Sequence, residues 1–124
     1  MKIRTTMTCP LELTHDIIKG ITGFTLLHLT AGNEAEFRIA LHRRHVGKGM
    51  GAEATRATVQ TGFDQFRLER ITLIVRKNNS RAARLYDRVG FRITGESVHT
   101  VRGKRFEFID MDITRVQFNM REHQ

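Results

Sequence analysis

A glycine-rich turn between a predicted strand and a predicted helix constrains the fold of this chain more than any other feature. Phe37, Ile39 and Leu41 alternate with other residues, which predicts a half-buried strand. Glycine then occupies every second position of the segment 47–51. An apolar stripe predicts a helix from there to about Phe66. The stripe comprises Ala52, Thr55, Val59, Phe63 and Phe66.

A strand, a glycine-rich turn and a helix in this order suit the binding of an anion. Glycines let the backbone turn tightly and approach a ligand, and a helix N-terminus attracts negative charge. Arg44 and Lys48 add positive charge there. The spacing differs from the nucleotide P-loop and from the dinucleotide fingerprint. The residues alone therefore leave two interpretations open, a phosphate site and an ordinary strand–helix turn.

The second half of the chain predicts another strand and helix. The run Ile71–Val75 is continuously apolar or β-branched, as expected for a strand covered on both faces. Asn79 or Ser80 is suited to cap a following helix, and Gly90 to end it. The apolar positions of that helix are Ala82, Leu85, Tyr86 and Val89.

Two further strands are predicted at about 92–101 and 105–113, joined by a turn at 102–103. The alternation slips between Phe108 and Ile109, which predicts a β-bulge at that point. Ahead of Phe37, only strands at 11–13 and 17–29 and a turn at 31–34 are expected. This order predicts a single domain, residues 1–124, of the α/β or α+β class with a mixed sheet.

Composition narrows the range of partners. The 124 residues include 21 basic and 13 acidic side chains, a formal charge of +8, which favours polyanionic partners such as nucleic acid or a phosphate-rich cofactor. Cys9 is the only cysteine, so no internal disulfide is expected and a cytoplasmic location is predicted. The N-terminus lacks the apolar core of a signal peptide, and the most apolar window, 24–29, is too short to span a bilayer. We therefore expect no membrane association.

Two motifs together resemble the signature of the GNAT superfamily of N-acetyltransferases. The matching residues are Arg44, Gly47 and Gly49 in the turn, followed by Asn79, Ala82, Tyr86, Gly90 and Phe91. Residues 35–37 and 101–105 look like the branch that holds the ribosomal-protein N-terminal acetyltransferases and spermidine acetyltransferase. The resemblance covers about residues 16–114 and implies a mixed, mostly antiparallel sheet with helices packed on it.

The resemblance also implies acetyl-CoA as the acetyl donor and a set of residues that contact it. Leu41 and His42 would border the pantetheine arm through their backbone, where the fourth strand splays from the fifth. Asn79 would hydrogen-bond the cofactor, and Tyr86 would lie near its sulfur. The turn residues implied to wrap the pyrophosphate are Arg44, Gly47, Lys48, Gly49, Met50 and Gly51.

The chemistry of acetyl transfer gives Tyr86 and Glu36 candidate roles. The departing thiolate needs a proton, which the Tyr86 hydroxyl can donate, and the amine must lose one, for which Glu36 is our candidate base. Three of the candidate residues have a structural alternative: Tyr86 as a core tyrosine, Glu36 as a solvated strand residue, and Asn79 as a helix cap. His42 and His45 lack further ligands nearby, so we expect no metal site.

The resemblance ends in residues 1–33, ahead of the predicted strand at 37–41. Family members carry two helices there that wall the acceptor groove, whereas residues 1–33 show no amphipathic helix. The acceptor site is therefore open, completed by a second subunit in a homodimer, or lost from a shortened chain. We expect the acceptor to be a protein N-terminus, including a ribosomal one, a polyamine or another small amine. The alternatives are an acyl-CoA-binding module without turnover and a basic ribosome- or nucleic-acid-binding domain.

Overall fold

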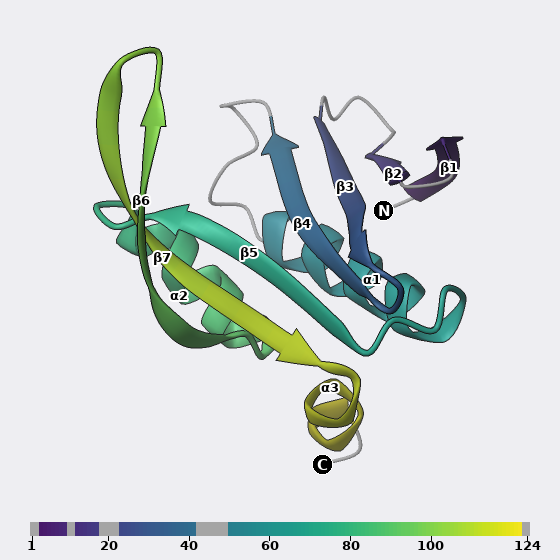
Figure 1. Ribbon diagram of the computed structural model, residues 1–124. Coiled ribbons are helices and arrows are strands. Elements are labelled where there is room, and N and C mark those ends of the chain that lie inside the picture. The colour runs from purple at the N-terminus through teal and green to yellow at the C-terminus, as the bar shows by residue number, and fades with distance from the viewer. Residues whose placement is uncertain (1–2, 10–11, 18–22, 42–49, 123–124) are drawn as a thin grey trace.

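The computed structural model describes residues 3–9, 12–17, 23–41 and 50–122, which form one sheet with helices packed on it (Figure 1). The sheet has seven strands in the order β1-β2-β3-β4-β5-β7-β6, and only β4 and β5 pair in parallel. This confirms the mixed, mostly antiparallel sheet. The strands are β1 Ile3–Cys9, β2 Glu12–Ile17, β3 Gly23–Ala31, β4 Glu34–Leu41, β5 Arg70–Arg76, β6 Arg92–Val101 and β7 Lys104–Thr114.

Helices α1 (Met50–Asp64) and α2 (Ser80–Val89) lie side by side behind the sheet (Figure 1). The predicted stripe of α1 is confirmed, because its central residues Val59 and Phe63 are buried in the core. Gly62 allows the helix to lie close to the sheet, since a Cβ there would stand 2.9 Å from Leu27 Cδ1. A third helix, α3 (Arg115–Glu122), follows β7 and had no counterpart in the sequence prediction.

Strand β5 is covered on one face only, and the prediction of cover on both faces was wrong. Ile71, Leu73 and Val75 are buried towards the helices, whereas Ile74 on the other face is 42% exposed. The reason is that α1 and α2 lie on the same side of the sheet, and no helix within the described ranges covers the other side (Figure 1). We call that second side the open face.

Helix α2 begins and ends where the sequence indicated. Asn79 is the N-cap, and its Oδ1 accepts a hydrogen bond from the Ala82 N–H at 3.2 Å. Gly90 is the C-cap with φ of 123°, a conformation that strongly favours glycine. Its N–H donates to the carbonyls of Tyr86 and Asp87. Local capping therefore fixes both ends of the helix that carries Tyr86.

The β6–β7 hairpin also forms as predicted, but its bulge lies elsewhere. Arg102 and Gly103 adopt φ of 51° and 78°, as a tight two-residue hairpin turn requires. The register shifts between Ile93 and Gly95 of β6, so Thr94 is the additional residue. The predicted bulge at 108–109 was wrong, because β7 keeps an unbroken register with β5. The slip in the apolar alternation instead marks the point where the apolar side chains of β7 change from one face of the sheet to the other.

The N-terminal part contributes strands to the sheet. Strand β1 pairs with β2, and β2 with β3, all antiparallel. Ahead of β3, the residues that the structure describes contain no helix, in agreement with the prediction of reduced or missing N-terminal helices. Strand β1 itself was not anticipated, and the predicted strand 17–29 corresponds to the end of β2 and most of β3.

Candidate active site

The central feature of the site is a divergence of β4 from β5. The two strands pair only where Glu34 to Glu36 lie beside Arg70 to Thr72, although β4 continues to Leu41 and β5 to Arg76. Beyond the last pair the strands separate (Figure 1). The predicted splay between the fourth and fifth strands is therefore present. A hollow of about 530 Å³ lies at this divergence.

Both strands, both large helices and β7 contribute to the wall of this hollow, which we call the splay hollow. It is mainly apolar, with arginines at its margin, so it fits a ligand that combines an apolar arm with anionic groups. The sequence had assigned Gly51, Asn79 and Tyr86 to such a site. The remaining lining residues are Ile39, Ala52, Ile74, Val75, Arg76, Arg81, Ala82, Leu85, Arg88 and Phe108.

Tyr86 is a core residue that also lines the splay hollow. Its ring makes edge contacts with Phe37 on β4 and with Phe91, at centroid distances of 6.2 and 5.9 Å. Burial raises the pKa of its phenol above the ordinary value, so the hydroxyl stays protonated through the neutral range. Within the described ranges the hydroxyl has no hydrogen-bond partner, although it is not one of the fully buried atoms that lack one. It is therefore accessible from the hollow that Tyr86 lines, and a ligand group there can hydrogen-bond to it.

Asn79 and Gly51 border the same hollow from the two helices. The Asn79 oxygen is used as a cap, which confirms the capping interpretation, and its amide N–H groups have no partner among the described residues. Helix α1 begins at Met50, so Gly51 lies in its first turn, where the helix dipole is positive. A Cβ on Gly51 would lie 3.0 Å from Leu85 Cδ1. The glycine therefore allows the two helices to approach closely beside the hollow.

Glu36 lies on the opposite side of the sheet from Tyr86. Its neighbour Phe37 contacts the Tyr86 ring, and adjacent residues of a strand point to opposite faces, so Glu36 faces the open side. The Glu36 carboxylate accepts a hydrogen bond from Arg38 Nε at 2.8 Å. Glu36 does not line the splay hollow, and it lies in the last residue pair before the strands diverge.

The turn between β4 and α1 is not part of the described structure. Leu41 is the last residue of β4, and its backbone pairs with Gly23. Five predicted cofactor-binding residues fall outside the described residues, and their roles stay predictions: His42, Arg44, Gly47, Lys48 and Gly49.

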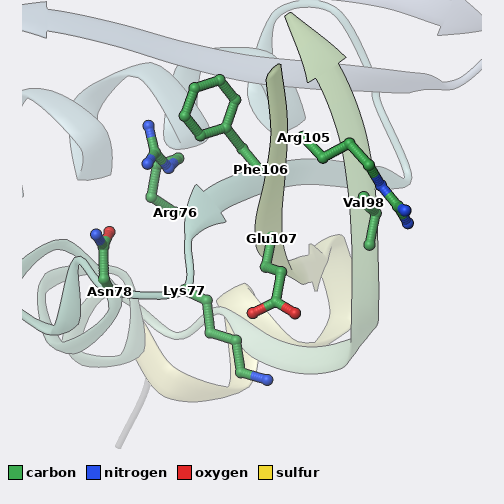
Figure 2. A pocket seen from close by; sticks show the side chains of 7 residues that line it. All are labelled: Arg76, Lys77, Asn78, Val98, Arg105, Phe106 and Glu107. Carbon is green, nitrogen blue, oxygen red and sulfur yellow. The ribbon is translucent and has the colours of Figure 1, made fainter. Parts of the chain in front are cut away.

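A second hollow, of about 790 Å³, lies between the segment after β5 and the β6–β7 hairpin (Figure 2). Arg76 lines both hollows, and its guanidinium stands over the Phe106 ring at 4.1 Å from the centroid. Lys77 and Glu107 also border it, and the Lys77 N–H donates to the Glu107 carbonyl. None of its lining residues was anticipated from the sequence.

Sequence reasoning also missed several residues of the splay hollow. Ile39 was assigned only to a half-buried strand, although its place before the turn indicated the position. Phe108 carried a signal in the slipped alternation of β7, which we had attributed to a bulge. Ile74 and Arg76 gave no signal, because their exposure depends on the open face and not on local pattern.

With this geometry in view, comparison with known proteins assigns the family. The sequence profile of the acetyltransferase (GNAT) domain matches residues 4–92. The chain belongs to the GNAT acetyltransferase family. It is 33% identical over 92 residues to spermidine N(1)-acetyltransferase of Escherichia coli (strain K12), covering 73% of this chain and 49% of that protein. It is 37% identical over 59 residues to spermine/spermidine N(1)-acetyltransferase of Bacillus subtilis (strain 168), covering 48% and 39% of the two chains. This GNAT chain thus spans about half the length or less of these relatives.

Solved structures share the GNAT fold with this chain. Spermidine N-acetyltransferase from Vibrio cholerae in complex with CoA and spermine has a TM-score of 0.79 at 24% identity, covering 89% of this chain and 69% of that one. The spermidine/spermine N-acetyltransferase from the same organism in complex with manganese ions has a TM-score of 0.82 at 24% identity, with coverages of 92% and 71%. At this identity the likeness establishes the fold alone.

The described residues contain no group of three or more histidine, cysteine, aspartate or glutamate side chains placed to hold a metal ion. Among the described helices, none has the length and apolar character to cross a bilayer.

Proposed function

We propose that this protein transfers the acetyl group of acetyl-CoA to a primary amine of a polyamine. The observation that carries the proposal is Tyr86, a largely buried residue that lines the splay hollow and whose hydroxyl has no partner in the described part of the chain. Family membership and relatives named for spermidine and spermine acetylation support the donor and the acceptor class.

The splay hollow fits the donor. An apolar cleft between strands whose edges are unpaired offers both packing surface and free backbone groups to a pantetheine arm. Arg81 and Arg88 at its margin are suited to phosphate groups. Bound there, acetyl-CoA supplies an activated thioester carbon for attack by the amine nitrogen.

Tyr86 and Glu36 face this reaction from opposite sides of the sheet. Tyr86, on the helix side, keeps its phenolic proton because burial raises its pKa, and donates it to the departing thiolate sulfur. Glu36, on the open face beside the divergence, accepts the proton that the amine nitrogen loses, directly or through water. The acceptor therefore approaches from the open face and the donor lies towards the helices.

The net positive charge of the chain has to be reconciled with a cationic polyamine acceptor. A formal charge of +8 disfavours a cationic substrate at long range, but the open face carries carboxylates beside the divergence. Glu34, Glu36, Asp110 and Asp112 belong to this face. Three of them are paired with Arg38 or Arg70, which leaves Asp110 as the described carboxylate of this group without a cationic partner. A polyamine carries a second ammonium group that can use it, so a protein N-terminus is the less favoured acceptor.

The test is release of CoA thiol from acetyl-CoA on addition of spermidine, followed with a thiol reagent. We expect saturable release that depends on both substrates, and loss of most activity in Glu36→Gln with unchanged acetyl-CoA affinity by calorimetry. Tight binding of acetyl-CoA without thiol release across a panel of amines would replace the enzyme with a binding module. Absence of acetyl-CoA binding would reject both.

We further propose a homodimer located in the cytoplasm. Several apolar side chains are exposed in the described chain, among them Ile93 at 65%, Val116 at 63% and Met120 at 64%. A domain of this size also buries a modest share of its unfolded surface, so a partner subunit adds stability. Light scattering coupled to size-exclusion chromatography tests the dimer, and a monomeric mass at micromolar concentration would reject it.

A further inference from the structure

One carboxylate on the open face differs from the others in its ion pairing. Glu36 is paired with Arg38, and Glu34 and Asp112 are both bound by Arg70. Asp110 has no cationic partner among the residues that the structure describes. Because an ionised carboxylate on a protein surface attracts a cation, this one is open to a cationic ligand.

Asp110 is nevertheless held in one orientation. Its Oδ1 accepts a hydrogen bond of 2.7 Å from the Ser97 hydroxyl. Ser97 donates its only proton there, so its oxygen accepts from His99 Nε2, which lies 3.1 Å away. Both hydrogen bonds point towards Asp110 and fix the orientation of its carboxylate. The chain of three side chains thus presents a fixed anion.

The second oxygen of Asp110 faces an open space. Gly95 is the residue opposite Asp110 on β6, and a Cβ there would lie 3.8 Å from Asp110 Oδ2. Since glycine has no side chain, the space above it is left for another group. Within the described ranges, Oδ2 has no hydrogen-bond donor.

The position of Asp110 relative to the splay hollow sets which nitrogen it contacts. Asp110 pairs with Ile74 of β5, and Ile74 lines the hollow. Adjacent strands lie about 5 Å apart, so Asp110 is one strand beyond the edge of the divergence. Arg76, the nearest arginine along β5, has its guanidinium over Phe106, towards the hairpin and away from Asp110.

We propose that Asp110, positioned by Ser97 and His99, binds a second ammonium group of a polyamine whose primary amine reacts at the divergence. This inference rests on the proposed acetyltransferase function and adds a specificity determinant to it. Asp110 is too far from the divergence to hold the reacting nitrogen. At a distance of one strand, however, it is within reach of the next nitrogen along the aliphatic chain of a polyamine. A monoamine has no group to place there.

The experiment compares two acceptors, spermidine and butylamine, in the wild type and in Asp110→Asn. We expect the KM for spermidine to rise roughly tenfold, as loss of a charge-assisted hydrogen bond at a solvent-accessible site implies. The KM for butylamine and the affinity for acetyl-CoA are expected to stay within about twofold, since neither contacts Asp110. Ser97→Ala, which frees the carboxylate to rotate, should raise the spermidine KM less.

Glu107→Gln is the matched control. It removes the same charge from the same strand, but its side chain points to the other face of the sheet. The inference is overturned if Asp110→Asn changes both acceptors equally, changes neither, or acts no more strongly than Glu107→Gln. If the wild type acetylates neither amine, the proposed function fails. Calorimetric titration of spermidine into the wild type and Asp110→Asn then decides the role of Asp110, and equal affinities reject it.

Discussion

On β5, Ile71 and Ile74 are three residues apart and belong to opposite faces of the sheet. Ile71 is fully buried under the helices, whereas Ile74 is 42% exposed. The buried face is apolar and leaves the Tyr86 hydroxyl unpartnered within the described chain. The open face instead carries charged side chains, and hydrogen bonds to Asp112 and Glu34 raise the pKa of Arg70. The helix-covered face is therefore suited to pack against a ligand. The open face is suited to attract a charged ligand from solution.

The largest expected effect comes from the Tyr86 hydroxyl on the helix-covered face. In Tyr86→Phe we expect kcat to fall by about 10²–10⁴-fold, because the thiolate loses its proton donor. Thermal stability should change little, since the hydroxyl has no partner in the described residues. Acetyl-CoA affinity should change little because the proton is needed only when the thiolate departs. Steady-state rates with saturating spermidine measure the first, and calorimetry and thermal melting the others. An unchanged kcat would reduce Tyr86 to a core residue.

The pH dependence provides a control for this interpretation. The pKa of Tyr86 is raised in the folded state by burial, so the folded protein retains the phenolic proton when the unfolded chain begins to lose it. Its contribution to stability is complete below the ordinary tyrosine pKa of about 10 and is lost as pH rises through the folded value. Denaturation midpoints between pH 8 and about pH 11 should fall more in the wild type than in Tyr86→Phe. Equal slopes would contradict the burial of the phenol.

The two isoleucines of β5 test the difference between the faces directly. Ile71→Ala should lower the free energy of unfolding by about 2–5 kcal/mol, because it leaves a cavity in the packed core. Ile74→Ala removes the same atoms from the open face and should cost less than about 1 kcal/mol. Urea denaturation measures both. Similar losses at the two positions would show that the open face is covered in solution, as a dimer interface would require.

Two substitutions of Asn79 distinguish its role as a helix cap from a role in ligand binding. Asn79→Ala should destabilise the protein by about 1 kcal/mol through loss of the helix cap, and Asn79→Ser should restore that stability. Both variants lack the side-chain amide, so both should bind acetyl-CoA more weakly, by up to about tenfold for one hydrogen bond. Thermal melting and calorimetry measure the two properties. Full recovery of acetyl-CoA affinity in Asn79→Ser would leave the residue with a capping role only.

The smallest effect is expected on the open face, at Arg70. This guanidinium contacts Glu34 at 2.8 Å and Asp112 at 2.7 Å, but its side chain is 41% exposed. Arg70→Met should therefore cost about 1 kcal/mol or less, and the loss should shrink at high salt. Arg92→Met, on the edge strand β6, is the control, since Arg92 has no ion pair in the described residues. A larger loss of stability that does not depend on salt would mean that water has less access to the open face than the exposure of Arg70 indicates.

Local signals predicted the part of the site that depends on local structure. Asn79 and Gly90 act at the ends of α2 as their residue types indicated, and the turn at 102–103 follows the same logic. Cover of β5 and the place of the bulge were not predictable, because both depend on which strands and helices become neighbours. The pairing of Glu36 with Arg38, and the chain from His99 through Ser97 to Asp110, arise from side chains meeting on one face of the folded sheet.

The parallel junction of β4 and β5 has a mechanical consequence. The backbone ladder that joins the β1–β4 half of the sheet to the β5–β7 half has only three residue pairs, at one end of the two strands. Along the rest of β4 and β5 the halves are joined by side chains and by the packing of α1 against α2. A molecule bound in the splay hollow would add contacts between the halves, and the rigidity of this GNAT domain would then depend on occupancy as well as on its own packing.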